Sequence, residues 1–194
     1  MTLCERWHEE TSSFHMPLGE MTVTMDDVTC LMHLTIEGIM LSHLKKMSLT
    51  EGADLMVTHL GVTQAVAVKN YNEEYGGYIS YKALREYYEG YIDSATRLSN
   101  PKNLGDPQKL ERVLTAYVKS YFLYLVGCLL IGDKSNKCIE LVYLTTMEDG
   151  YAGMHNYSWG GMTVAYLYDE IAEARLPGDR ALGGNVTLLT VRNL

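Results

Sequence analysis

The sequence lacks the features of a disulfide-stapled, secreted or membrane-spanning protein. Its four cysteines form no C-x-x-C pair, and their scarcity favours a reducing compartment. The N-terminal segment MTLCERWHEE is charged and has no apolar core, so we expect no signal peptide. The most apolar run, residues 121–131, has eleven residues, whereas a membrane helix needs about 20. We therefore expect no membrane span and predict that this run is a buried helix.

Positive charge is also scarce. The chain has 16 Lys and Arg against 24 Asp and Glu, which gives a formal net charge of −8. That balance opposes non-specific binding along a nucleic-acid backbone, which requires positive charge. Hydrophobic residues make up 47% and charged residues 21% of the 194 positions, as in an ordinary soluble globular protein. A chain of this length predicts a single domain that folds without a metal ion or disulfides.

The recognisable motifs of nucleotide binding and hydrolysis are absent or incomplete. Residues 127–135 resemble a P-loop, but Asp133 separates the second glycine from Lys134. A P-loop also follows a strand, whereas the apolar residues here predict the end of a helix and a turn. No G-x-S-x-G nucleophile elbow occurs. We predict no catalytic residue. An enzyme whose site is assembled from distant positions is kept as an alternative hypothesis.

The metal-ligating residues do not form a set. Cys30 and His33 make one C-x-x-H pair, and no second pair completes the four ligands that structural zinc requires. We interpret Cys30 as a small core residue on the apolar side of a helix. The sequence therefore predicts no metal site and no cofactor.

A short β-hairpin is predicted near the N-terminus. SSFHM and MTVT flank a turn built from Pro17, Leu18, Gly19 and Glu20. Thr24 follows as a helix cap, with Asp27 three residues later in a variant of the capping box.

The rest of the chain predicts helices. Ser48 or Thr50 caps a helix that ends at Gly61, Ser80 starts another, and Asp106 with Pro107 starts the longest. The remaining elements are a short helix over 63–75 carrying Ala65, Val66 and Val68, an apolar segment 138–148 predicted as a helix with a strand as the alternative, and a last helix from Asn156 or Ser158. We predict a mainly α fold, a single helical domain over residues 1–194 with a small N-terminal β-hairpin.

Tyrosine is the compositional oddity, with 15 residues against two phenylalanines. Seven tyrosines lie between residues 71 and 91. Packing with hydroxyls at the core boundary is the favoured reading, and a protein interface is the second. Base stacking is the third, because the stretch 97–119 carries five Lys or Arg against two acidic residues.

Two sequence blocks are more specific than any of these candidate sites. The first is F-H-x-P-x-G-E-M-T-V-T from residue 14 to 24, and the second is Y-S-W-G from residue 157 to 160. With these blocks the chain resembles the plant mobile domain, also called the aminotransferase-like plant mobile domain, over about residues 5–189. The motif residues that we single out as structural or interface candidates are Trp7, Phe14, His15, Pro17, Gly19, Glu20, Tyr157, Trp159 and Gly160.

The resemblance implies a nuclear plant protein of transposon descent. Members of the family act in transposon silencing, control of gene expression and meristem maintenance, so we expect a non-enzymatic interaction domain. The partner that the resemblance implies is a protein, a serine/threonine phosphatase-like one. The alternative is a transposon-encoded protein associated with nucleic acid through residues 97–119. A pyridoxal phosphate enzyme needs a Schiff-base lysine and a phosphate cup, and no such set is found.

The motif residues are interpreted first as structure. Pro17 and Gly19 suit a turn, Trp159 suits a core anchor, and Gly160 allows close helix packing. Trp7 is expected beneath the hairpin. The family domain usually continues beyond Leu189 into an aromatic-rich segment, which predicts a copy truncated at its C-terminus.

Overall fold

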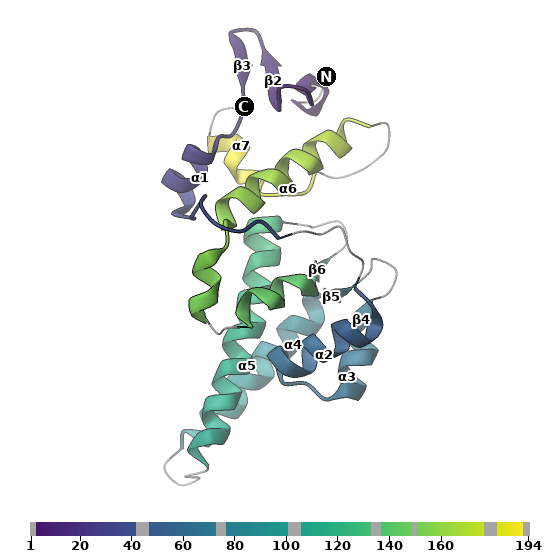
Figure 1. The fold of residues 1–194 in the computed structure, drawn as a ribbon, viewed down its shortest axis with the longest axis vertical. Helices are drawn as coiled ribbons and strands as arrows, with labels where there is room; N and C mark the ends of the chain where they lie inside the picture. The colour runs from purple at the N-terminus through teal and green to yellow at the C-terminus, as the bar shows by residue number, and fades with distance from the viewer. Residues whose placement is uncertain are drawn as a thin grey trace. The chain divides into compact units, whose positions relative to one another are not determined.

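The computed structural model describes residues 3–41, 47–72, 77–100, 106–132, 137–148, 151–176 and 182–191. Helices occupy most of these residues, as predicted (Figure 1). The chain divides into two compact units. The first unit comprises Met1–Leu41, Cys128–Asn136 and His155–Leu194, and the second comprises Ser42–Gly127 and Lys137–Met154. The prediction of a single domain stays a prediction.

The first unit opens with a three-stranded antiparallel sheet. A short 3-10 helix, η1 (Leu3–Arg6), leads into β1 (Trp7–His8), β2 (Ser13–Met16) and β3 (Gly19–Met21), in the order β1-β2-β3. The predicted hairpin is confirmed as β2 and β3. Gly19 has a φ of +126°, a conformation that favours glycine. Trp7 lies in β1, a strand that was not predicted because two residues are too few for sequence periodicity to show, and its buried ring packs against Phe14 of β2.

The α-helices described in the first unit are α1 (Met25–Met32), α6 (Trp159–Ala174) and α7 (Thr187–Val191). The capping box of α1 is confirmed, since the Thr24 side chain accepts from the Asp27 backbone and the Asp27 carboxylate accepts from the Thr24 backbone. These helices and the sheet share one apolar core. Its buried residues are Trp7, Phe14, Val23, Val28, Val164, Leu167, Ile171, Leu188 and Leu189.

The placement of Cys30 in this core was wrong, because its side chain is exposed. Helix α1 is eight residues long and buries only Val28. Cys30 lies two positions further, about 200° around the helix axis, and therefore points away from the core. A helix this short has no room for a broad apolar face.

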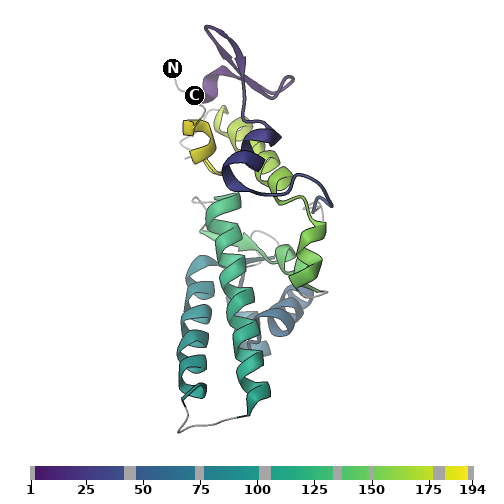
Figure 2. The same cartoon turned by 90° about the vertical axis from the view of Figure 1, so that its left-hand side faces the viewer.

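The second unit is helical with a small antiparallel sheet. Its helices are α2 (Leu49–Leu60), α3 (Gln64–Asn70), α4 (Tyr81–Leu98) and α5 (Pro107–Leu125), and its strands β4 (Tyr71–Asn72), β5 (Tyr78–Ser80) and β6 (Cys138–Glu140) run in the order β4-β5-β6. Two 3-10 segments, η4 (Leu141–Met147) and η5 (Tyr151–Asn156), follow β6, and η5 ends in the first unit. Helices α4 and α5 lie side by side and antiparallel (Figure 2). The predicted helix starts at Ser48, Ser80 and Asp106 are confirmed.

Three predictions for these segments need correction. Helix α3 ends at Asn70 and buries Ala67, whereas Val66 and Val68 are exposed. The segment 138–148 is neither one helix nor one strand, since a strand passes into a 3-10 helix. The run 121–131 continues α5 into the π-helix η3 (Val126–Ile131) and is only partly buried, with Leu129 56% exposed.

Within the described residues, one helix is long and apolar enough to cross a membrane by length and composition. It spans Pro107–Ile131, and a third of its most apolar window is buried in the protein. The core helix of a soluble protein meets the same criterion.

The capping box of α2 predicts a measurable contribution to stability. Ser48 accepts a hydrogen bond from the Glu51 amide and donates its hydroxyl to the Glu51 carboxylate. We expect Ser48→Ala to destabilise the second unit by about 1 kcal/mol. Thr63 occupies the cap position of α3 without a side-chain bond, so Thr63→Ala should cost clearly less. Hydrogen exchange at the α2 amides measures the difference, and equal protection in both variants would contradict it.

Candidate functional site

The N-terminal sheet has two chemically different faces. Trp7 pairs with Phe14, and both side chains are buried in the core of the first unit. His15 pairs with Glu20, and these side chains are 63% and 50% exposed. Because successive side chains in a strand point to opposite faces, one face packs inward and the other faces solvent. We define the outer face as His8, Ser13, His15 and Glu20, of which Ser13 is itself buried.

The inner face is held by aromatic packing. The Trp7 ring lies 4.9 Å from Phe14, edge to face, and 5.0 Å from Tyr168 on α6. Tyr168 in turn donates its hydroxyl to the Val23 carbonyl at 2.5 Å. These contacts fix the sheet on α6 and thereby set the orientation of the outer face.

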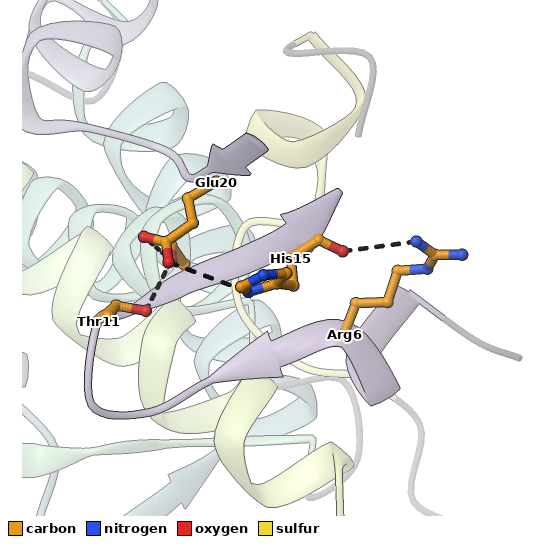
Figure 3. Close-up of polar contacts among 5 residues, drawn as sticks. Arg6, Thr11, His15 and Glu20 are labelled. Carbon is orange, nitrogen blue, oxygen red and sulfur yellow. Dashed lines mark hydrogen bonds and ion pairs between the residues drawn. The ribbon is translucent and has the colours of Figure 1, made fainter. Parts of the chain in front are cut away.

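The outer face carries a connected set of polar groups (Figure 3). The His15 Nδ1 lies 3.9 Å from a Glu20 oxygen, an ion pair when the imidazole is protonated. The other Glu20 oxygen accepts from Ser13 at 3.2 Å, and Ser13 shares a 2.8 Å hydrogen bond with Thr11. The His8 and His15 rings are 4.8 Å apart. Glu20 is therefore held between two strands while its carboxylate stays accessible to solvent.

Arg6 adds a positive group at the edge of the same sheet. Its guanidinium donates to the His15 carbonyl at 3.4 Å (Figure 3). The outer face thus offers an acidic acceptor, two imidazoles and a guanidinium within one small area. Such a mixture suits hydrogen bonding to another protein surface, where polar rims surround apolar contacts.

The second motif block anchors the start of α6. Gly160 donates its amide to the Thr35 carbonyl at 2.8 Å, and Ser158 donates its hydroxyl to the Ile36 carbonyl at 2.8 Å. A Cβ at Gly160 would lie 3.0 Å from the Thr35 oxygen, so glycine permits this close approach. Trp159 is 8% exposed, and its ring lies 6.3 Å from that of Tyr157. The block therefore holds the segment 35–40 against the start of α6 through hydrogen bonds.

All nine candidate motif residues belong to the first unit. Trp7, Phe14, Trp159 and Gly160 are buried, and Tyr157 is half-buried. The exposed members are His15, Pro17, Gly19 and Glu20, all on or beside the hairpin. The sequence reasoning missed His8 and Ser13. Ser13 stands two residues from His15 on the predicted strand and therefore shares its face, whereas His8 joins them only once β1 is known to pair with β2.

Ser13 on the outer face donates a hydrogen bond to the Glu20 carboxylate, and among the described residues no hydrogen bond joins Ser13 to His15. Within the same part of the chain, no group of three His, Cys, Asp or Glu residues is arranged to hold a metal ion.

The tyrosines of the second unit serve packing. Tyr88 lies edge to face with Tyr121 and Tyr124, which joins α4 to α5. Tyr91 donates to the Leu60 carbonyl and Tyr71 donates to the Met47 carbonyl. These contacts support the interpretation that the tyrosines pack between helices. Association with nucleic acid through residues 97–119 stays a prediction, and Lys102 lies outside the described residues.

Lys119, at the end of the stretch 97–119, forms a hydrogen bond with a buried histidine. Its ammonium donates to the Nδ1 of His59 at 3.0 Å, and the His59 side chain is almost fully buried. Burial, together with the Lys119 charge, lowers the pKa of His59 below its ordinary 6.5. Burial also lowers the pKa of Lys119. The pair therefore keeps a neutral imidazole next to an ammonium group.

The lowered pKa of His59 predicts acid sensitivity. As the pH falls below 6.5, the unfolded chain protonates this histidine while the folded chain does not. The contribution of His59 to the free energy of unfolding is therefore fully present above that pH and declines as the pH falls toward the folded pKa. Urea midpoints between about pH 7.5 and about pH 5 should shift less in His59→Gln than in the wild type. The exposed His155→Gln should keep the wild-type slope, and identical slopes in all three proteins would refute the assignment.

Comparison with known proteins gives consistent matches over the whole chain. The family model described as the plant mobile domain matches residues 1–192. The protein MAINTENANCE OF MERISTEMS of Arabidopsis thaliana is 27% identical over 187 residues, which cover 96% of this chain and 34% of that protein. MAIN-LIKE 2 from the same plant is 28% identical, with coverage of 96% and 25%.

A third relative carries a phosphatase name. The Arabidopsis thaliana serine/threonine-protein phosphatase 7 long form homolog is 31% identical over 188 residues, which cover 96% of this chain and 12% of that protein. The chain spans about a third or less of the length of these curated relatives. No solved structure matches this chain.

Proposed function

Because this chain belongs to the plant mobile domain family, we propose that it is a non-enzymatic nuclear interaction domain of transposon descent. It binds a protein partner and acts in transposon silencing, gene-expression control and meristem maintenance. The similarity to a protein named for the maintenance of meristems supports this assignment.

One observation carries the interaction role. The outer face places His8, His15 and Glu20 on a rigid sheet whose inner face is locked into the core. A preorganised polar surface loses little side-chain entropy on binding, so its hydrogen bonds contribute more fully to affinity. The face is therefore the contact surface for the partner in this proposal.

The proposed partner is a serine/threonine phosphatase-like protein. In the relative named as a phosphatase 7 long form homolog, the region similar to this chain makes up 12% of the protein. A domain that is fused to a phosphatase in one protein is a reasonable candidate for association with a separate phosphatase in another. Association, and not catalysis, is the role proposed for this chain.

A pull-down from plant nuclei tests the proposal. The full chain is tagged, the extract is treated with nuclease, and bound proteins are identified by mass spectrometry. A matched pair of variants separates the surface from general charge effects. His15→Ala with Glu20→Gln alters the outer face, whereas Arg85→Ala with Glu89→Gln removes an exposed ion pair on α4.

We expect recovery of a phosphatase-like protein that survives nuclease treatment. Its yield should fall at least about fivefold with the outer-face variant and stay unchanged with the α4 variant. Equal recovery with both variants would exclude the outer face as the contact. Recovery only of nuclease-sensitive proteins would replace this function by association with nucleic acid.

A further inference from the structure

The second unit contains a pocket that the proposed function does not use. It is bordered by α2 and η4 and has a volume of about 660 Å³. Pockets that bury small ligands have volumes of about 300–1,000 Å³. All the described residues that line the pocket belong to the second unit, so the pocket is separate from the outer face.

The lining combines apolar surface with negative charge. Met47, Leu55 and Val142 supply the apolar part. Glu51, Asp54 and Glu148 supply three carboxylates, and the described lining includes no lysine or arginine. Glu51 is held in place by its hydrogen bond to the Ser48 amide at 2.9 Å. This charge pattern attracts cations and repels anionic ligands.

A buried histidine adds a directed donor. His59 is 5% exposed and lies in the wall between this pocket and a second one lined by residues of α4 and α5. Because the Lys119 ammonium donates to Nδ1, that nitrogen acts as the acceptor and the proton of the neutral ring lies on Nε2. Among the described residues, Nε2 has no hydrogen-bond partner. In the same part of the chain, Trp7 Nε1 is the one side-chain polar atom that is both unpaired and fully buried, so His59 Nε2 is not fully buried. Nε2 therefore keeps access to solvent as an N–H donor.

We propose that this pocket binds a peptide segment of a partner protein in which an arginine or lysine stands beside a large apolar side chain. The apolar side chain packs on Met47, Leu55 and Val142. The cation pairs with Asp54 and Glu148, and a peptide carbonyl accepts from His59 Nε2. A free polyamine lacks the apolar group and an acidic peptide lacks the cation, so neither satisfies all three features.

Three capped peptides test this inference by NMR titration of the full chain. Their sequences are Leu-Arg-Leu, Leu-Gln-Leu and Leu-Glu-Leu, which differ only in the central charge. We expect shifts at the amides of α2 residues 54–59, with the arginine peptide binding at least about fivefold more tightly than the glutamate peptide. Binding that is equal for both peptides, or the absence of shifts in α2 at millimolar peptide, would overturn the proposal.

A charge reversal makes the test sharper. Asp54→Arg combined with Glu148→Arg should invert the preference, so that the glutamate peptide binds more tightly than the arginine peptide. Glu86→Arg makes a charge change of the same kind on the exposed surface of α4 and should leave the preference intact. If the double variant does not fold, Asp54→Asn alone should weaken the arginine peptide and leave Leu-Gln-Leu unchanged. An unchanged preference in these pocket variants would refute the site, whatever the outcome for the outer face.

Discussion

Replacing Trp7 with alanine is expected to lower the free energy of unfolding of the first unit by about 3–5 kcal/mol. The side chain is 3% exposed and packs on both Phe14 and Tyr168. Its removal leaves a cavity between the sheet and α6, which the short strands are too constrained to fill. Urea denaturation followed by tryptophan fluorescence measures the change, because Trp159 remains as a reporter in the same unit.

A second substitution at this position separates packing from hydrogen bonding. The Trp7 Nε1 is buried without a partner among the described residues, and such an unpaired donor costs about 1–3 kcal/mol. Trp7→Phe removes this donor and keeps most of the ring contact, so we expect a loss of roughly 1 kcal/mol. Leu18→Ala, at a side chain that is 99% exposed, should be neutral. A Trp7→Phe loss as large as the alanine loss would show that the unpaired donor carries no cost.

Gly38→Ala is the second substitution with a large expected effect. Gly38 has a φ of +116°, and an added Cβ would overlap the Asn156 carbonyl and lie 2.9 Å from its carbon. Backbone strain costs about 1–3 kcal/mol, and overpacking adds about 1–3 kcal/mol. We therefore expect a loss of about 2–5 kcal/mol, together with weaker protection of the Ile39 amide, which donates to Asn156.

Gly19→Ala is the matched control for this prediction. Gly19 also has a positive φ, of +126°, but nothing lies within 4 Å of an added Cβ. The control therefore contains the backbone strain without the steric overlap, and it should cost less than Gly38→Ala. Both positions lie in the first unit, where the two tryptophans report unfolding. Equal losses would mean that the segment at Gly38 moves to accept the methyl group.

Local signals gave reliable predictions wherever a few neighbouring residues decide the structure. The turn at Pro17 and Gly19, the capping box at Thr24 and the helix start at Asp106 are confirmed. In each case the interactions involve residues within three or four positions, so the sequence contains the whole motif. The helical class of the fold follows from the same local periodicity.

Burial was harder to predict where elements are short. Cys30 on α1 was interpreted as an apolar-face residue, yet it is exposed, as are Val66 and Val68 on α3. Helices of seven or eight residues contact the core through one or two side chains, and which side chain that is depends on the neighbour they meet. The sequence of such a short helix does not indicate which element it will pack against.

The sequence by itself determined the family, the mainly helical class, the hairpin and the helix starts, because these depend on motifs and local chemistry. Only the tertiary structure decided that His8 joins Ser13, His15 and Glu20 on one face, since β1 must first pair with β2. It likewise brought His59 to Lys119, 60 residues away, beside the carboxylates of the α2 pocket. Both arrangements depend on long-range contacts, whose geometry is set by the packing of whole elements and is not written in any local pattern.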